Sequence, residues 1–440
     1  MQVVVVGTGH VGLITAATLA AVGHDVVGLD DDEEKIGALR QGVCPFFEPG
    51  LQVLLEQMMN AGRLRFDLEG SGAVNGAEVI FFCVGTPPRA SGEASLVSLE
   101  RAARSIASSL SGPTVVVEKS TVPAGTAERL LLVLRFERPD LVDEIEVVSN
   151  PEFLREGQAV EDALHPDRIL VGARSSRGFE TMRRLFEPLI RDGSRLIETD
   201  MPTAELAKHA SNAFLALKIS FANALARLCE RAGADVTAVV DVMGSDPRIG
   251  RAFLDAGLGY GGFCFPKDLQ AFERLAARLG YDFPLLREVE RINGEAVEAT
   301  VDKVKDALWN LEDKRIALLG LSFKPNTDDV RFSPALALAR RLLDEGATVV
   351  GYDPWAAANA KSELPGLEVA STADDAMEGA HCMVVCTDWD DFRSLDLRRA
   401  RGLLAHPIVV DGRNVFDPDK MKAEGFVYYG TGRATHRSAH

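Results

Sequence analysis

Residues 2–30 read as a strand, a tight turn, a helix and a second strand, and this order constrains the fold more than any other part of the chain. The apolar run Gln2–Val6 leads into Gly7-Thr8-Gly9-His10-Val11-Gly12, and a helix is expected from about Leu13 to Ala21. Glycines at this spacing let a pyrophosphate approach the helix N-terminus, where free N–H groups favour anions. The pattern predicts an α/β domain that binds a dinucleotide; a Gly-rich turn without a ligand is the alternative.

The second strand, Asp25–Leu29, is followed by Asp30, Asp31 and Asp32. A carboxylate at the end of this strand can accept hydrogen bonds from ribose hydroxyls, and it repels the 2′-phosphate of NADP. The sequence therefore favours NAD as the dinucleotide.

The same order of elements returns after residue 314. Arg315–Gly320 is a strand into a turn, a helix is expected at about Pro334–Glu345, and the strand Ala347–Tyr352 ends in Asp353. Segments 379–387 and 407–411 likewise echo segments 76–84 and 113–118. The repeat predicts two doubly wound α/β domains. The second copy has Gly320–Pro325 in place of the glycine pattern, so we expect it to bind something other than a dinucleotide. Lys324, Arg331 and Arg413 supply cations suited to phosphates or a nucleotide sugar.

Between the two copies, residues 203–232 have the apolar periodicity of one long helix, and a second helical region is expected at about 265–309. We predict an N-terminal dinucleotide-binding domain at 1–199, a central helical domain at 200–310, a C-terminal domain at 311–430 and a flexible tail at 431–440. Lys208 and Asn212, four positions apart, should project from one face of the long helix and reach a common oxygen.

Gly259-Tyr260-Gly261-Gly262-Phe263-Cys264-Phe265-Pro266-Lys267-Asp268 is the segment richest in reactive groups. Its glycines should leave the backbone open to a ligand, and a neighbouring cation stabilises the thiolate form of a cysteine. Cys264 is therefore a candidate nucleophile. A buried structural cysteine in a Gly-rich turn is the alternative.

Two further turns follow predicted strands. Gly85-Thr86-Pro87-Pro88 ends the strand 77–84, and Thr121 follows the strand 115–118; ligands of doubly wound sheets lie at such carboxyl ends. In Asn150–Gly157, Glu152 and Glu156 would share a face if the segment after Pro151 is helical, which suits proton transfer. Capping and surface charge remain the other interpretation of these two acids.

The formal charge of −17 and the pI of about 5.0 argue against a nucleic-acid partner, which would require a basic stripe. The chain starts with a strand-like run and has no apolar stretch near the roughly 18 residues that span a bilayer, so we expect a cytoplasmic protein without a membrane partner. The six cysteines are dispersed and lack zinc-like spacing, so we expect reduced thiols and no metal.

Taken together, these motifs resemble the UDP-glucose/GDP-mannose dehydrogenase family over about residues 1–430. The resemblance rests on the glycine turn 7–12, Gly85-Thr86-Pro87, Ser120-Thr121-Val122-Pro123, Asn150-Pro151-Glu152-Phe153-Leu154, Ala204-Glu205-Leu206-x-Lys208-x-x-x-Asn212, the segment 259–268 and Asp411-Gly412-Arg413. Phe263 departs from the smaller or hydroxylated residue that the family usually has there. The segment His165–Ile169 is more similar to the UDP-glucose branch than to the mannose branch, and Cys264–Asp268 is less similar to the acetamido-sugar branch.

The resemblance implies a four-electron oxidation of the C6 alcohol of a nucleotide sugar by two NAD in turn, through a thiohemiacetal and a thioester on Cys264. The implied catalytic residues are Cys264, Lys208, Asn212, Asp268, Glu152 and Thr121. The implied NAD contacts are Gly7, Gly9, His10, Val11, Gly12, Asp30, Lys35, Val84, Gly85, Thr86, Pro87, Thr121, Glu156, Lys267 and Arg331. The implied sugar-nucleotide contacts are Glu152, Phe153, Leu154, Arg155, Lys208, Asn212, Arg248, Phe253, Asp255, Leu258, Gly259, Tyr260, Gly261, Phe265, Phe323, Lys324 and Arg413, with Arg248 reaching in from a neighbouring subunit.

Other functions remain open at this point. A two-electron hydroxyacid dehydrogenase needs neither the cysteine nor a second α/β domain, and a non-catalytic NAD sensor would not need the set of Cys264, Lys208 and Asn212. Within the family, a thymidine nucleotide, GDP-mannose or a UDP-N-acetylhexosamine are the other substrates. The long helix is apolar over more than one stripe, so we expect a homodimer or a higher even oligomer.

Overall fold

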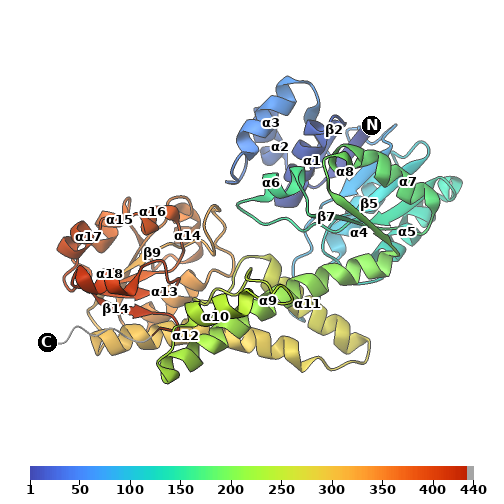
Figure 1. Ribbon diagram of the computed structural model, residues 1–440. Coiled ribbons are helices and arrows are strands. Elements are labelled where there is room, and N and C mark those ends of the chain that lie inside the picture. Colours follow the sequence, from blue (N-terminus) through green and yellow to red (C-terminus); the bar gives the residue numbers. More distant parts are fainter. Residues whose placement is uncertain (434–440) are drawn as a thin grey trace. The chain divides into compact units, whose positions relative to one another are not determined.

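The computed structural model describes residues 1–433, in which two parallel sheets each have helices on both faces (Figure 1). By its internal contacts the chain forms two units: residues 1–211 with 270–281, and residues 212–269 with those from 282 onward. No helix among the described residues is long and apolar enough to cross a membrane. In that part of the chain no cysteine is in a disulfide, and no group of three or more His, Cys, Asp or Glu side chains is placed to hold a metal ion.

The sheet of the first unit has the strand order β3-β2-β1-β4-β5-β6-β7-β8. Its strands are β1 (Gln2–Val6), β2 (Asp25–Asp30), β3 (Leu64–Leu68), β4 (Val79–Phe82), β5 (Thr114–Glu118), β6 (Ile145–Ser149), β7 (Arg168–Gly172) and β8 (Arg195–Thr199). All neighbours pair parallel except β6 and β7. The strand order reverses between β1 and β4, which is where a doubly wound sheet binds its ligand.

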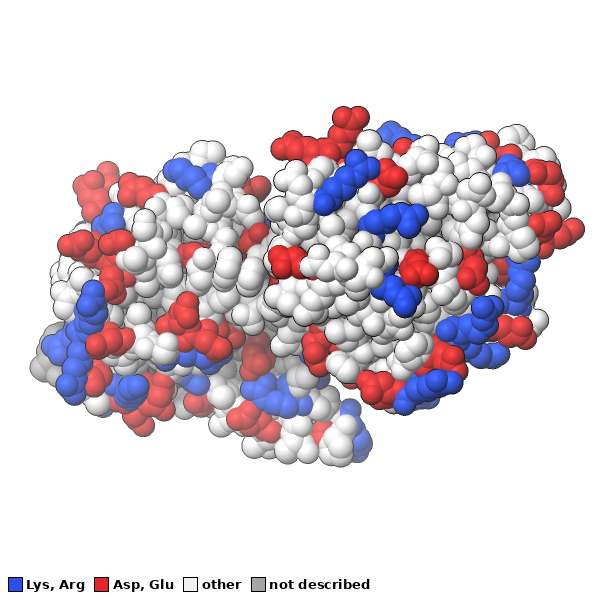
Figure 2. All heavy atoms as spheres, turned by 90° about the horizontal axis from the view of Figure 1, so that it is seen from above, with Lys and Arg blue, Asp and Glu red and all other residues white. Residues whose placement is uncertain are grey.

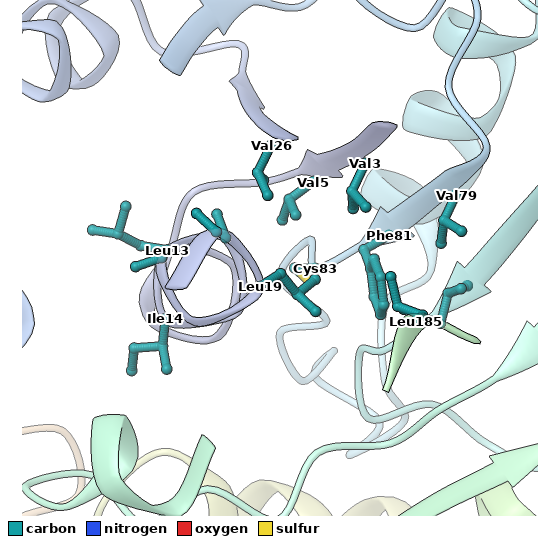
Figure 3. Packing of buried hydrophobic residues seen from close by; sticks show 14 of the residues in the cluster. Val3, Val5, Leu13, Ile14, Leu19, Val26, Val79, Phe81, Cys83 and Leu185 are labelled. Carbon is teal, nitrogen blue, oxygen red and sulfur yellow. The ribbon is translucent and has the colours of Figure 1, made fainter. Parts of the chain in front are cut away.

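Two hydrophobic clusters cover the two faces of this sheet. On one face, α1 (His10–Ala21) packs Leu13 and Leu19 against Val3, Val5 and Phe81 of the strands (Figure 3). The remaining helices of the unit are α2 (Glu33–Arg40), α3 (Leu51–Asn60), α4 (Val97–Ala107), α5 (Thr126–Glu137), η1 (Pro139–Leu141), α6 (Ala159–Leu164), α7 (Ser176–Leu185) and α8 (Glu187–Arg191). Because strands buried on both sides need apolar residues throughout, β1 and β4 lack the alternation of a half-exposed strand.

The second sheet has the order β11-β10-β9-β12-β13-β14, the same as that of the first six strands. Its strands are β9 (Arg315–Leu319), β10 (Thr348–Tyr352), β11 (Glu368–Val369), β12 (Cys382–Val385), β13 (Ile408–Asp411) and β14 (Val427–Gly430). Its helices are α13 (Pro334–Asp344), α14 (Ala357–Glu363), α15 (Ala373–Met377), α16 (Asp390–Arg393), α17 (Leu397–Leu403) and α18 (Pro418–Ala423). The predicted pair of doubly wound domains is confirmed.

The two α/β domains also share a hydrogen-bond pattern at the turn after their first strand. Asp30 accepts from the backbone N–H and the hydroxyl of Thr8, at 2.7 and 2.8 Å. Asp353 accepts from the backbone N–H and the hydroxyl of Ser322 in the same way, at 3.0 and 2.9 Å. In both copies an acid at the end of the second strand holds the turn after the first strand.

The middle of the chain is helical, with α9 (Met201–Ala232), α10 (Val236–Gly244), α11 (Cys264–Arg278) and α12 (Pro284–Leu308). The single long helix is confirmed. The helical region expected at about 265–309 consists of two helices, because the chain leaves α11 after Arg278 and starts α12 at Pro284. Gly280, with a φ of +79°, and the proline at the start of α12 account for the break.

Thr431 and Gly432, the first residues of the predicted tail, are held by hydrogen bonds. Thr431 donates its hydroxyl to the backbone oxygen of Asp411 at 3.2 Å, and the N–H of Gly432 donates to Glu230 at 2.8 Å. The rest of the predicted tail, 434–440, lies outside the described residues.

Acidic and basic side chains are interspersed on the face shown in Figure 2.

Candidate active site

In the turn between β1 and α1, two of the three glycines are required by close neighbours and the third lies beside open space. Gly7 has a φ of +90°, and a Cβ there would lie 2.9 Å from the backbone oxygen of Cys83. A Cβ on Gly12 would overlap the backbone oxygen of Gly7. A Cβ on Gly9 would have no atom within 4 Å, so the turn is open beside this residue. This division matches the three requirements of a turn that receives a pyrophosphate.

Helix α1 begins directly behind this opening. Its N-cap residue is Gly9, and no side chain caps the helix, so the N–H groups of the first turn remain available to an anion. The side chain of His10 is fixed by the buried carboxylate of Glu48, whose Oε2 lies 3.0 Å from Nε2 of the histidine. The residues of the turn therefore fit the pyrophosphate of NAD.

Asp30 lies at the end of β2 and is 5% exposed. Lys35 Nζ lies 3.0 Å from both of its carboxylate oxygens, one of which also accepts the two bonds from Thr8. Burial alone would raise the pKa of Asp30, but the hydrogen bonds from Thr8 and Lys35 hold that pKa below its ordinary value. The carboxylate is thus ionised and retains lone pairs for ribose hydroxyls.

The turns after β4 and β5 are tied together. The hydroxyl of Thr86 donates to the backbone oxygen of Thr121 at 3.0 Å, and that of Ser120 donates to the backbone oxygen of Val84 at 2.8 Å. Gly85 and Pro87 stay exposed between them. The predicted cofactor residues 84–87 and Thr121 therefore form one surface at the carboxyl ends of these strands.

A buried ion pair joins α9 to the segment after β6. Lys208 Nζ lies 2.9 Å from Glu152 Oε1, and the two side chains are 4% and 6% exposed. Glu152 Oε2 also accepts from the N–H of Leu154 at 2.5 Å. A charge held in place and out of water interacts strongly with any charge that develops beside it, so this pair can stabilise an oxyanion or transfer a proton.

The prediction that Glu152 and Glu156 share a helical face is wrong. Residues 151–155 form no helix, and α6 begins only at Ala159. Local bonds explain the difference, because Glu152 accepts from its own chain two residues on and Asp162 takes the N–H and the guanidinium of Arg155.

Phe153 faces two cations. The guanidinium of Arg168 lies 3.8 Å from the ring centroid and Lys208 Nζ lies 5.3 Å from it. These contacts fix the aromatic ring beside the ion pair of Lys208 and Glu152.

In the second unit, Cys264 is the first residue of α11 and is partly exposed. The N-terminus of a helix stabilises a thiolate. We expected Lys267 to be the stabilising cation, but its Nζ lies 2.6 Å from Asp268 Oδ1. The N-terminus of α11 is therefore the feature at Cys264 that would favour a thiolate.

Asp268 is fully buried and links Asn212, a predicted catalytic residue, to Lys267, a predicted NAD contact. Its Oδ2 accepts from the amide of Asn212 at 2.6 Å, while its Oδ1 faces Lys267. The amide of Asn212 is thereby oriented, since its nitrogen points to Asp268 and its oxygen points elsewhere.

The glycines before Cys264 do not leave open backbone as expected. A Cβ on Gly262 would lie 2.7 Å from the ring of Phe323, and one on Gly259 would lie 2.6 Å from the amide oxygen of Asn293. A Cβ on Gly261 would overlap the backbone oxygen of Phe332. The space beside these glycines is filled by the protein itself, so they position the loop rather than admit a ligand.

Phe263, the departure from the family pattern, is packed against cations. Arg331 lies 4.5 Å from its ring centroid and Lys267 Nζ lies 5.6 Å from it. Arg331 is itself held by Asp329 at 2.6 Å. The ring thus helps to fix two residues that the resemblance assigns to NAD.

Arg413 follows β13 and is partly buried. Its guanidinium donates to the backbone oxygens of Cys386 at 2.8 Å, Gly259 at 3.2 Å and Phe323 at 3.4 Å. Burial lowers the pKa of Arg413 below its ordinary value. The residue ties the predicted sugar-nucleotide loop to the second sheet, and Lys324 lies over the ring of Phe323 at 5.4 Å.

The other predicted sugar contacts lie near this loop or on the surface. The rings of Phe253 and Tyr260 lie 6.2 and 5.8 Å from that of Phe265, and Leu258 is buried. Asp255 is paired with Arg251 at 2.7 Å. Arg248 is paired with Asp246, and its side chain is 87% exposed.

Several residues that sequence reasoning missed support these groups. Glu48 accepts from the N–H groups of Gly157 and Ala159, both at 2.8 Å, in addition to holding His10. Lys119 Nζ bonds Asn150 at 3.1 Å, and burial lowers the pKa of Lys119. Lys119 and Asn150 follow directly after β5 and β6, so their place at strand ends is a signal that could have found them; Glu48 offers no such signal.

Three consecutive family models match this chain. They are the NAD binding domain, the central domain and the UDP binding domain of the UDP-glucose/GDP-mannose dehydrogenase family, at residues 1–190, 202–295 and 317–418. The chain belongs to this family. NAD as the cofactor of the first domain is thereby confirmed.

Relatives in the family align over nearly the whole chain. A UDP-glucose 6-dehydrogenase of Rhizobium meliloti is 44% identical over 98% of this chain and 100% of its own length. One from Bacillus subtilis is 42% identical over 98% of both chains. The solved structure of a UDP-glucose dehydrogenase from Pyrobaculum islandicum is 37% identical, with a TM-score of 0.89 over 98% of both chains.

Proposed function

We propose that the protein is a cytoplasmic, NAD-dependent UDP-glucose 6-dehydrogenase that oxidises UDP-glucose to UDP-glucuronate. The observation that carries this proposal is the placement of Cys264 at the start of α11, four residues before an Asp268 that orients Asn212. A two-electron dehydrogenase has no use for such a thiol. The high identity to UDP-glucose 6-dehydrogenases favours UDP-glucose over the other nucleotide sugars.

In this proposal each of the three predicted domains has a separate role. Residues 1–199 bind NAD through the turn 7–12, Asp30 and residues 84–87. When it is bound, NAD is the hydride acceptor of the reaction. Residues 311–430 bind the nucleotide of the sugar, with Lys324 as a phosphate partner. Residues 200–310 carry the thiol.

In the first oxidation the C6 hydroxyl loses its proton and C6 gives up a hydride equivalent to the bound cofactor, which leaves the aldehyde. Lys208 and a water held by Asp268 are the proposed base, and Lys208 and Asn212 stabilise the negative charge on the oxygen. Each such donor contributes roughly 3–4 kcal/mol in comparable sites.

The thiolate of Cys264 then adds to the aldehyde carbon, and the aldehyde oxygen takes up a proton to give a thiohemiacetal. Loss of that proton and of a second hydride equivalent gives a thioester. Water, positioned by Thr121 and deprotonated by Glu152, attacks the thioester carbon, which releases the acid and restores the thiol. Glu152 suits this role because its carboxylate is already oriented by Leu154 and Lys208.

Substitution of Cys264 tests the proposal. Wild-type enzyme should form two NADH per sugar. Cys264→Ser should bind both substrates and accumulate a sugar ester visible by intact-protein mass spectrometry, because a serine ester hydrolyses more slowly than a thioester, whereas Cys264→Ala should show no adduct. A ratio near one with free aldehyde, or full turnover by Cys264→Ala, would contradict the mechanism.

We also propose that the protein is a homodimer or a multiple of one. In the single chain four large apolar residues of α9 at nearly heptad spacing remain exposed: Leu206, Phe214, Phe221 and Leu228, at 41%, 61%, 48% and 58%. A stripe of this kind on one helix indicates packing on a partner helix. Light scattering that shows only a 47.5 kDa particle would contradict it, and would remove the proposed reach of Arg248 into a neighbouring subunit.

A further inference from the structure

The first unit contains a pocket of about 300 Å³ that none of the steps above uses. It lies between the turn after Arg89, the start of α4, the N-terminal half of α5 and the C-terminal half of α11. Its apolar floor consists of Leu96, Leu99, Leu130, Val133 and Leu275. A volume of this order lies at the lower end of the roughly 300–1,000 Å³ of ligand pockets.

Four arginines line this pocket: Arg89, Arg129, Arg274 and Arg278. Most arginines of the described chain are in ion pairs, but none of these four has a carboxylate within ion-pair distance among residues 1–433. Glu93 and Glu100 also line the pocket, and Glu100 is paired with Arg104 at 3.0 Å. In a chain of net charge −17, four unpaired guanidinium groups around one cavity favour an anion.

The four arginines come from three segments: the turn at 89–92, helix α5, and helix α11, which carries both Arg274 and Arg278. Arg274 packs over the turn at Gly92, where a Cβ would lie 3.3 Å from its Nε, and that turn is closed by a bond from the N–H of Gly92 to the oxygen of Arg89 at 2.8 Å. Arg129 is in the first turns of α5, whose N-terminal N–H groups are already taken by the carboxylate of Glu205. The anion would thus be bound by side chains rather than by a free helix end.

We propose that this pocket is a second ligand site, distinct from the dinucleotide turn, which takes a small phosphorylated molecule with an apolar or aromatic group, such as a nucleoside diphosphate. The arginine forks bind the phosphates and the leucine floor takes the flat group. The site does not include Thr121 or Cys264, although α5 follows the loop of Thr121 and α11 begins at Cys264, about 15 Å along the helix axis from Arg274.

Binding of a fluorescent ADP derivative tests the proposal. The full-length protein is first saturated with NAD and UDP, so that the two expected nucleotide sites are occupied, and the probe is then titrated by anisotropy. We expect one further site per chain. Arg274→Gln with Arg278→Gln should weaken this binding by about tenfold or more, since two charged donors are lost.

Two further variants make the outcome specific. Val133→Trp removes no charge and should block the site by filling it, whereas Arg65→Gln, at an exposed arginine of β3, should leave binding unchanged. Circular dichroism and NADH production confirm that each variant is folded. No binding above the saturated sites, or equal binding by the wild type and the Arg274/Arg278 double variant, would overturn the proposal. The proposed dehydrogenase activity would be unaffected by that result.

Discussion

The ammonium group of Lys208 is a buried cation whose Nζ lies 2.9 Å from the carboxylate of Glu152. Replacing Lys208 with methionine removes this cation and leaves a side chain of similar length. Both side chains are almost fully buried, at 4% and 6% exposure, so water cannot take the place of the lost partner. Glu152 would keep its hydrogen bond from the N–H of Leu154. The substitution therefore isolates a charge without opening a large cavity.

The expected cost follows from this burial. Breaking a buried ion pair by removing one partner destabilises a protein by roughly 3–5 kcal/mol, because the remaining charge is left uncompensated. Lys208→Met with Glu152→Gln should recover most of that loss, since the amide oxygen of glutamine can still accept from Leu154 and no charge remains. Turnover should fall in both variants, by about 10²–10³-fold for the loss of one oxyanion donor.

The assay is a double-mutant cycle by urea unfolding, followed by circular dichroism, on the wild type, Lys208→Met, Glu152→Gln and the double variant. A coupling free energy of about 3 kcal/mol or more is expected. Coupling below about 0.5 kcal/mol would refute the reasoning, because that is the value of an exposed pair.

Three other substitutions test single steps of the argument. Burial raises the pKa of Glu205 from 4.5 to about 7. The stability that Glu205 contributes is therefore fully present below pH 4.5 and is lost as the pH rises through about 7. Glu205→Gln should reduce this pH dependence of the unfolding free energy by up to about 3 kcal/mol, measured by urea unfolding at pH 5 and 8. Asp30→Ala should raise the ratio of kcat/KM for NADP to that for NAD by at least tenfold, and an unchanged ratio would mean that Asp30 does not select the cofactor. Phe263→Ser should raise the KM for NAD several-fold by removing the ring beside Arg331, which would then be positioned by Asp329 without it, whereas Phe263→Tyr should not; equal effects of the two would rule out a role of the ring face.

Much of the fold was predictable because its signals are local. The strand, turn and helix at 2–21 have apolar periodicity and glycine spacing that are complete within 20 residues, and the same is true of the second copy. The long helix α9 and the strand ends that carry Thr121 and Arg413 follow from the same kinds of pattern.

The helix considered for residues 151–156 does not form, because side-chain hydrogen bonds to the backbone compete with it. Spacing allowed a helix that would have paired Glu152 with Glu156, but side-chain bonds to Leu154 and Arg155 hold this segment in an irregular form. A side chain that bonds its own backbone competes with the helix, and periodicity does not register that competition.

The sequence by itself determined the two doubly wound sheets, the dinucleotide turn and the identity of the reactive residues, because each depends on neighbours within one element. Only the tertiary structure decided their partners. Glu152 meets Lys208 and Asp268 meets Asn212 across 56 residues in each case. Such pairings depend on how separate elements pack, and the spacing of residues along the chain does not encode the distance between two side chains brought together by folding.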